Sequence, residues 1–295
     1  MYTDSDLARW DAHERVHVSQ ERIHVSRFTG SILWAHLTNA RAIAREFPRC
    51  GHVVLQASNM VWVRRGLTAQ VRKRGASIHL PGHFLVSPDS SLAGSHHIVE
   101  PPTPEWSQSL DSPIMRSLMA PRNIATKQQH EGSFFHTGAL TTFASFLDDW
   151  AAAQPEGNLS SLIIRASFTP TAAPEEVWLQ TWLLNFRRDE LRPPPPTGHL
   201  SDVLCLFPVA APEYYTTREE VRCVRNGRSS SRNGRFLAVK RVARDLEDPI
   251  TRFAMLPSEA EAEEQPSTSC AVLEDGMGEK QYMMGQELQH LVTVK

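Results

Sequence analysis

Apolar side chains recur at intervals of three and four residues in three stretches of the chain, which is the spacing of an amphipathic helix. The stretches are residues 31–47, 138–153 and 173–191. In the first stretch Ser31 is predicted to cap the helix, and Pro48 ends the pattern. The third stretch is apolar around much of its circumference, which predicts a helix in the core.

The third helix carries the residues that favour a helix start. Pro174 suits the first turn, and Glu175 and Glu176 favour the positive end of the helix dipole. Near the other end, Trp182 and Phe186 are both predicted to be buried. Truncating either aromatic side chain is therefore expected to destabilise the fold.

Alternation of apolar and polar residues predicts short strands elsewhere. It occurs in the repeated pentapeptides RVHVS and RIHVS at residues 15–19 and 22–26, and in residues 52–65, which form one strand or two strands with a bend. Residues 160–168 also predict a short strand, whereas residues 101–121 contain several prolines and predict a connection with one short helix. The pattern as a whole predicts an α+β fold in which helices predominate.

The composition divides the chain into three parts. Residues 1–11 predict a flexible N-terminus, and residues 12–250 contain the periodic segments and predict one folded unit. Residues 251–295 contain the acidic stretch SEAEAEEQPSTSCAVLEDGMGEKQ, which is poor in aromatic residues. Such a stretch cannot bury enough apolar surface to order itself, so a largely disordered tail is predicted.

The composition also limits the class of protein. The chain has 295 residues, of which 41% are hydrophobic, and a formal net charge of −2, which fits a soluble globular protein without a global attraction to nucleic acid. No window approaches the ~18 apolar residues of a membrane span. The N-terminus lacks the apolar core of a secretory leader. We expect a protein that is made and used inside a cell, without a membrane span.

The histidines and cysteines are the candidates for metal binding and catalysis. The four cysteines form no C-x-x-C pair, which predicts reduced thiols and no zinc site. No metalloprotease, nucleophile-elbow or phosphate-loop motif accompanies the histidines. We therefore expect no metal, no cofactor and no catalytic residue, and an enzyme built on the histidines remains an alternative. The histidines considered are His17, His24, His96, His97, His130 and His136.

Two arginine-rich stretches are candidates for binding RNA. They are residues 64–75 (RRGLTAQVRKRG) and residues 222–235 (RCVRNGRSSSRNGR), both interpreted as flexible loops. Arginine side chains suit phosphate groups, but neither stretch contains an aromatic residue on which a base could stack. Solvated loops are the favoured interpretation, and an RNA-binding protein that works through these arginines is the alternative.

Three short motifs together resemble one family of viral proteins. The motifs are LPGHF at residues 80–84, LLNF at residues 183–186 and FPVAAP at residues 207–212. This combination resembles the P-zero silencing-suppressor proteins of poleroviruses, which couple an F-box-like Leu-Pro-x-x-Leu/Ile motif with a later helix ending in Leu-Asn-Phe. The chain departs from the family pattern at Phe84, where the family has leucine or isoleucine. Residues 85–100, which separate Phe84 from Pro101 as the trailing proline of the motif, also form a longer spacer than the family generally shows.

The resemblance implies a fold and a function without catalysis. A short helix beginning at the Leu-Pro dipeptide would place its apolar face in a groove of a Skp-type adaptor of a cullin ubiquitin ligase. The protein would bring host Argonaute to this ligase for degradation and so suppress RNA silencing. It would act in the cytoplasm of the plant host cell, with the nucleus as a second compartment. The partner-binding residues implied are Leu80, Pro81, Phe84 and Pro101, and the family-like structural residues are Leu184, Asn185, Phe186, Phe207, Pro208 and Pro212.

Overall fold

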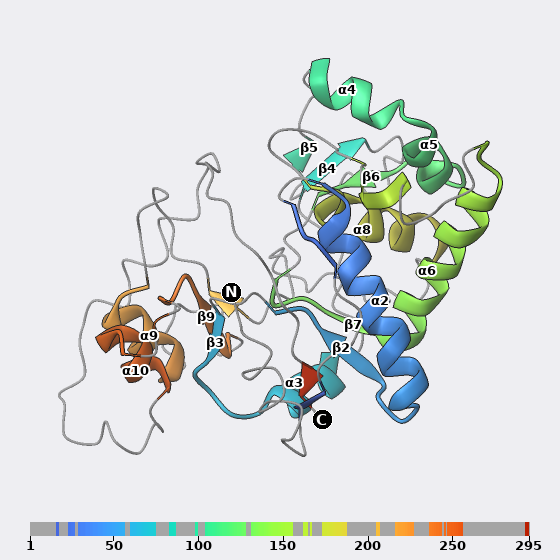
Figure 1. Ribbon diagram of the computed structural model, residues 1–295. Helices are drawn as coiled ribbons and strands as arrows, with labels where there is room; N and C mark the ends of the chain where they lie inside the picture. The colour runs from blue at the N-terminus through green and yellow to red at the C-terminus, as the bar shows by residue number, and fades with distance from the viewer. Residues whose placement is uncertain are drawn as a thin grey trace.

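The three strongest helical patterns in the sequence form the three helices that build the main core (Figure 1). These are α2 (Ser31–Glu46), α6 (Thr137–Ala152) and α8 (Pro174–Phe186). Their positions confirm the predicted helices, and the predicted α+β class with predominating helices is confirmed as well. Among the helices that the structure describes, none combines the length and the apolar character needed to cross a membrane.

A computed structural model of the chain provides these observations. It describes residues 16–17, 23–26, 29–56, 60–74, 83–86, 98–99, 104–127, 131–155, 162–164, 166, 173–187, 205–206, 216–226, 236–243, 245, 247–255 and 293–294. Of residues 16–17, 73–74, 83–86, 98–99, 104–106, 205–206 and 293–294, only the backbone is described.

The main core lies where α2, α6 and α8 meet. Leu37, Phe143, Leu147 and Val177 are completely buried there, and Trp178 is 2% exposed. Because α8 is apolar around most of its circumference, it is buried on nearly all sides. Burial of this kind contributes about 25 cal/mol per Å² of apolar surface removed from water, which makes this cluster the largest stabilising contribution that the structure describes.

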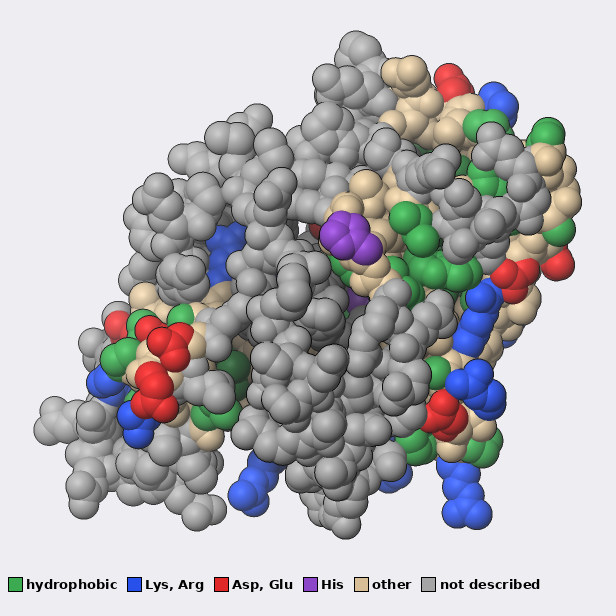
Figure 2. Space-filling view, in the orientation of Figure 1, with side chains coloured by type: hydrophobic (Ala, Val, Ile, Leu, Met, Phe, Trp, Pro, Cys, Tyr) green, Lys and Arg blue, Asp and Glu red, His purple; other side chains and the backbone are tan. Residues whose placement is uncertain are grey.

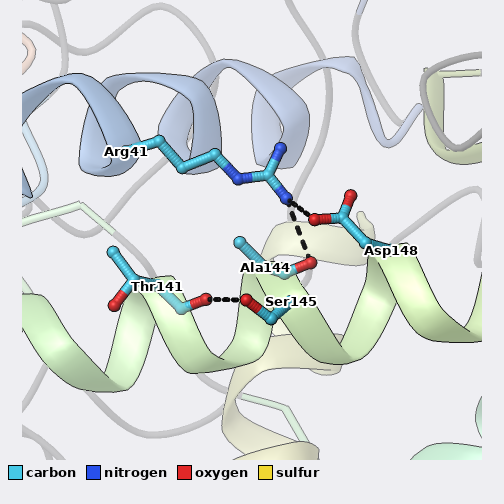
Figure 3. Close-up of polar contacts among 5 residues, drawn as sticks. All are labelled: Arg41, Thr141, Ala144, Ser145 and Asp148. Atoms are coloured by element: carbon cyan, nitrogen blue, oxygen red, sulfur yellow. Dashed lines mark hydrogen bonds and ion pairs between the residues drawn. The ribbon is translucent and has the colours of Figure 1, made fainter. Parts of the chain in front are cut away.

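A polar contact fixes how α2 lies against α6 (Figure 3). The Arg41 guanidinium forms an ion pair with Asp148 and also donates a hydrogen bond to the Ala144 carbonyl at 3.1 Å. The same guanidinium lies 5.7 Å from the ring centre of Trp34, two helix turns earlier on α2. The contact sits at the edge of the apolar interface, where both charges remain partly hydrated.

In the described part of the chain, ten short strands pair into small sheets. The pairs are β1 (Val16–His17) with β10 (Thr293–Val294), and β2 (His52–Val54) with β7 (Phe134–His136), both antiparallel. One three-stranded sheet has the order β3-β9-β8 and consists of β3 (Met60–Trp62), β9 (Ala238–Lys240) and β8 (Cys205–Leu206). The other has the order β5-β4-β6 and consists of β5 (Ile98–Val99), β4 (His83–Val86) and β6 (Ala125–Thr126).

A second, smaller apolar cluster surrounds β3 and β9. Two helices cover it, α9 (Arg218–Arg225) and α10 (Pro249–Met255). Val221, Val224 and Val239 are completely buried in this cluster. Asp248 accepts hydrogen bonds from the backbone N–H groups of Thr251 and Ile250 in the first turn of α10, and these bonds hold the pKa of its carboxyl below the usual value.

The start of α2 differs from the prediction. Gly30 precedes the helix, and Ser31 is a buried first helical residue whose hydroxyl binds the backbone of Ser26. A Cβ atom on Gly30 would lie 2.1 Å from the carbonyl oxygen of Ile163, so this position has no room for a side chain. Residues 162–164 form a helical turn there, so the predicted strand at 160–168 is wrong for this part.

Several segment boundaries also differ from the predictions. The connection at 101–121 contains two helices, α4 (Pro104–Leu110) and α5 (Pro113–Met119), where one was predicted. Residues 23–26 are not a strand, although residues 16–17 are. The boundary predicted at residue 250 falls inside α10, because Thr251 and Ala254 are buried and the folded part extends to Met255. Residues 1–11 and 256–292 lie outside the described part.

Candidate docking site on helix α8 and its sheet

The F-box-like motif lies only partly within the described residues, and its described part is a strand. Residues 83–86 form β4, so the helix predicted through Phe84 is wrong at this position. The backbone of β4 instead pairs with β5 on one side and with β6 on the other. A segment with partners on both edges satisfies its backbone groups without helical hydrogen bonds. The residues outside the described part are Leu80, Pro81, Pro101, Phe207, Pro208 and Pro212.

The strand pairing connects the motif to helix α8 through β6. Phe84 of β4 lies opposite Thr126 of β6. The backbone N–H of Thr126 donates to the Thr181 hydroxyl at 3.2 Å, and that hydroxyl donates back to the Thr126 carbonyl at 3.4 Å. Because Thr181 is a completely buried residue of α8, the helix holds one edge of this sheet in place.

Asn185 makes the second connection between α8 and this sheet. Its side-chain oxygen accepts from the Ile124 backbone N–H at 3.3 Å, and its side-chain nitrogen donates to the Ile124 carbonyl at 2.7 Å. The same nitrogen donates to the Thr181 carbonyl one turn earlier in the helix, at 2.7 Å. A side chain with both a donor and an acceptor can satisfy both backbone groups of one residue, which an apolar residue cannot do. Asparagine in the Leu-Asn-Phe motif therefore has a structural role.

The three residues of the Leu-Asn-Phe motif differ in exposure. Leu184 is completely buried and Asn185 is 3% exposed, whereas Phe186 is 39% exposed. The prediction that Phe186 is buried is therefore wrong, while the burial predicted for Trp182, at 3% exposure, is confirmed. Phe186 is the last residue of α8, and only one side of its ring packs against the protein.

Three aromatic rings lie together at this end of α8, and two of them form a stack that the third meets at a tilt. The ring centres of Trp182 and Phe186 lie 6.0 Å apart with nearly parallel planes, and Phe146 of α6 lies 5.2 Å from Phe186 and 6.2 Å from Trp182. Trp182 supports the stack from the core, where it also contacts Phe143 at 5.3 Å. Phe186 thus packs on Phe146 and Trp182 while it remains 39% exposed, and an exposed aromatic ring is a candidate anchor for protein binding.

The N-terminal end of α8 carries two acidic side chains, of which Glu175 is buried and Glu176 is partly buried. Burial raises the pKa of the Glu175 carboxyl well above its usual range, and it raises the pKa of Glu176 to about 7. The negative charge of Glu131 adds to both shifts, although Glu131 forms an ion pair with Lys240. The positive charge of Lys127 works in the opposite direction on Glu176. Because of these groups, the stability of the core at the N-terminal end of α8 depends on pH.

We expect the stability of the fold to fall as the pH rises from about 4.5 to 7. A carboxyl with a raised pKa binds its proton more tightly in the folded chain than in the unfolded chain. Its contribution to the free energy of unfolding is therefore complete below pH 4.5, the pKa in the unfolded chain, and is lost as the pH rises to about 7, the pKa in the folded chain. For Glu176, which is partly exposed, the loss is roughly 2 kcal/mol. Urea denaturation at several pH values should show that the free energy of unfolding falls less steeply with pH in Glu176→Gln than in the wild type.

The matched control for this experiment is Glu220→Gln. Glu220 occupies the same third position of its helix, α9, where its carboxylate accepts from the Thr217 backbone N–H, as that of Glu176 accepts from Ala173. Glutamine can keep either hydrogen bond. An equal change of pH dependence in both variants would contradict the assignment of this dependence to Glu176.

The histidine alternatives do not assemble into a catalytic group in the described part of the chain. His136 is exposed at the end of β7, and its ring lies tilted against that of His52 of β2, with ring centres 4.1 Å apart. His24 is exposed outside any strand, and the side chain of His17 is not described. The described residues contain no cluster of three histidine, cysteine, aspartate or glutamate side chains that could hold a metal ion. His96, His97 and His130 lie outside the described part.

The cysteines and arginines differ from their sequence interpretations. Cys50 is a free thiol as predicted, whereas Cys223 is disulfide-bonded, so the prediction of reduced thiols is wrong for this residue. Residues 67–74 form helix α3 (Leu67–Arg74) where a loop was predicted. The second arginine stretch begins inside α9, and Arg225 is buried at 7% exposure instead of solvated. No sequence pattern distinguished this arginine from its neighbours.

Comparison with models of protein families, with curated proteins and with solved structures finds no match to this chain.

Proposed function

We propose that this chain is a viral suppressor of host RNA silencing that acts as an F-box-like adaptor. In this proposal it binds a Skp-type protein of a cullin ubiquitin ligase and brings Argonaute to that ligase for degradation, in the cytoplasm of a plant cell. The chain supplies binding surfaces and no catalytic group. The motifs LPGHF, LLNF and FPVAAP support the proposal by their resemblance to the P-zero proteins.

One structural observation carries the proposal furthest. Residues 83–84 of the LPGHF motif and the LLNF motif at residues 183–186 belong to one hydrogen-bonded unit, although they lie far apart in the sequence. Phe84 pairs with Thr126 in the sheet, and Thr126 is bound to Thr181, one turn before the Leu-Asn-Phe motif. An adaptor needs its docking segment fixed to a rigid body, because ordering a flexible segment on binding costs affinity.

The proposed docking segment is therefore anchored by a strand. Leu80 and Pro81 directly precede β4, and three residues of chain span at most about 11 Å, so the Leu80 Cα stays within that distance of the His83 Cα. The exposed ring of Phe186 offers a separate apolar surface, which we assign to the second protein partner. Two surfaces on one rigid unit can hold the ligase adaptor and its target at the same time.

The change of Leu80 and Pro81 together to alanine tests the adaptor. Loss of an apolar anchor from a small interface costs ~2 kcal/mol or more, which is over tenfold in affinity. We expect capture of a purified plant Skp-type protein and silencing suppression in leaves to fall together. The melting temperature should remain that of the wild type, because the adaptor role requires an exposed Leu80.

The chain contains its own matched control, because Leu256 and Pro257 are a second Leu-Pro dipeptide. The double change Leu256→Ala and Pro257→Ala should leave capture and suppression unchanged. Full suppression by a soluble Leu80→Ala, Pro81→Ala variant would contradict the adaptor function. A strongly lowered melting temperature of that variant would instead place Leu80 in the core, which contradicts the docking role.

A further inference from the structure

The positive charges of the chain are concentrated in two stretches that contain no acidic residue. Residues 47–88 hold six of the 31 Lys and Arg side chains, and residues 221–244 hold eight, with no Asp or Glu in either. The formal net charge of the whole chain is −2, so this separation creates a local positive field that the average hides.

The β3–β9 pairing brings these two stretches together. Trp62 of β3 lies opposite Ala238 of β9, and beyond the ladder the backbone N–H of Arg64 donates to the Leu237 carbonyl at 3.1 Å. The Arg64 guanidinium donates to the Phe236 carbonyl at 3.1 Å, which ties the start of the first arginine run to the end of the second. Arg235 is bonded to Phe236, so its Cα lies about 3.8 Å from the Phe236 Cα in any conformation.

Helix α3 presents cations on the side away from the core. Val71 is 6% exposed and packs with Phe134, and Leu67, four residues earlier, packs against the same cluster. Arg72 is exposed about 100° around the helix from Val71, and Arg65 is exposed just before the helix starts. Within the described part of the chain, neither of these two arginines forms an ion pair or a side-chain hydrogen bond. Their charge is therefore available to a ligand.

The region of α9 and α10 has a different character. Both acidic and basic side chains appear over these helices in the space-filling view (Figure 2). Arg252 pairs with Glu247, and the guanidinium of Arg225 is used inside the protein. Arg65 and Arg72 therefore place unpaired positive charge at α3 and the end of β3, inside the acid-free stretch 47–88, whereas the exposed Arg116 and Arg122 near α5 lie outside both acid-free stretches.

The chemistry of this surface favours the backbone of a duplex over single-stranded bases. Arginine binds phosphate oxygens with two parallel hydrogen bonds. The stretch 64–75 contains no aromatic side chain that could stack on a base. Trp62, the nearest aromatic residue in sequence, is partly buried, and its indole N–H donates to Gln56 at 2.8 Å.

We propose that Arg65 and Arg72, on the surface formed by α3 and the end of β3, bind the phosphate backbone of duplex RNA without reading its sequence. This activity goes beyond the adaptor function and does not need the docking segment. The choice of RNA over DNA rests on the proposed function, since silencing acts through RNA.

Fluorescence anisotropy with a short labelled duplex RNA over a series of KCl concentrations tests the surface. We expect the wild type to bind with an affinity that falls steeply as KCl rises. The double variant Arg65→Ser, Arg72→Ser removes two phosphate contacts, so its slope of log affinity against log salt should be smaller by about two, and binding should weaken about tenfold or more. Both residues are exposed, so the melting temperature should be unchanged.

The matched control is Arg116→Ser, Arg122→Ser, which removes two exposed arginines near α5 and changes the net charge equally. It should alter binding less than about twofold. An equal loss in the control, or no binding by the wild type, overturns the proposal. Three outcomes overturn the choice of duplex RNA as the ligand. They are tighter binding of single-stranded RNA than of duplex RNA, equal binding of duplex DNA and duplex RNA, and displacement of the RNA by poly-glutamate of equal charge.

The same samples separate this proposal from the adaptor function. The Arg65→Ser, Arg72→Ser variant should still capture the Skp-type protein, and the Leu80→Ala, Pro81→Ala variant should still bind duplex RNA. Loss of RNA binding in the second variant with an unchanged melting temperature would overturn the placement of the RNA surface at α3.

Discussion

Replacement of Trp182 by alanine is expected to lower the free energy of unfolding by about 3–5 kcal/mol. The side chain is 3% exposed and contacts Phe143 and Phe146, so its removal leaves a cavity between α6 and α8. A domain has only about 5–15 kcal/mol of stability in total, so the variant should also accumulate poorly in cells. The midpoint of urea denaturation measures the effect directly.

Phe186→Ala is the matched variant for this measurement. Phe186 belongs to the same aromatic stack and lies one turn further along α8, but it is 39% exposed. Its truncation leaves no closed cavity and should cost about 1 kcal/mol. A loss as large as that of Trp182→Ala would mean that the ring is buried in solution. Normal accumulation of the variant with lost capture of Argonaute would support the partner surface assigned to Phe186.

Replacement of Arg225 by serine is expected to cost about 3 kcal/mol, although the sequence places this residue in a run of solvated arginines. Its guanidinium donates to the carbonyls of Phe253 and Ala254 at 2.6 and 3.0 Å, and it lies 5.1 Å from the centre of the Phe253 ring. Without the arginine, the last turn of α10 loses both donors in a buried position. Thermal unfolding should show a clearly lower melting temperature.

The control for Arg225 is the triple change of Arg228, Arg232 and Arg235 to serine. These residues follow in the same arginine run, which the sequence predicts to be solvated, so their replacement should change stability by no more than ~0.5 kcal/mol. If Arg225→Ser were as mild as the triple variant, the buried hydrogen bonds of Arg225 would not contribute to the fold. This outcome would restore the interpretation of the whole run as solvated.

The position and type of the main helices follow from the sequence alone. The stretches 31–47, 138–153 and 173–191 repeat apolar residues at helical spacing over several turns, and the structure contains a helix in each. A pattern of this length has one low-energy solution, because only a helix places all those side chains on the same side. The short helix near residues 115–119 was predictable for the same reason, with Pro113 at its first turn.

The short segments were not predictable from local pattern. Residues 162–164 (LII) and 84–86 (FLV) are both apolar, yet the first segment is a helical turn and the second belongs to strand β4. Three apolar residues fit either period, so their partners decide their conformation. Those partners are Gly30 in the first case, and β5 and β6 in the second.

The exposure and ionisation of individual side chains also depend on distant contacts. Phe186 and Trp182 have the same pattern in the sequence, but Trp182 faces α6 from within the core and Phe186 lies at the open end of α8. Arg225 is drawn inside by carbonyls of α10, and Glu176 has a raised pKa because the folded chain removes it from water. Local periodicity therefore specifies which segments are helices, whereas the contacts between segments specify which side chains of those helices reach solvent or a partner. Such contacts join residues far apart in the chain, and no window of sequence contains both partners.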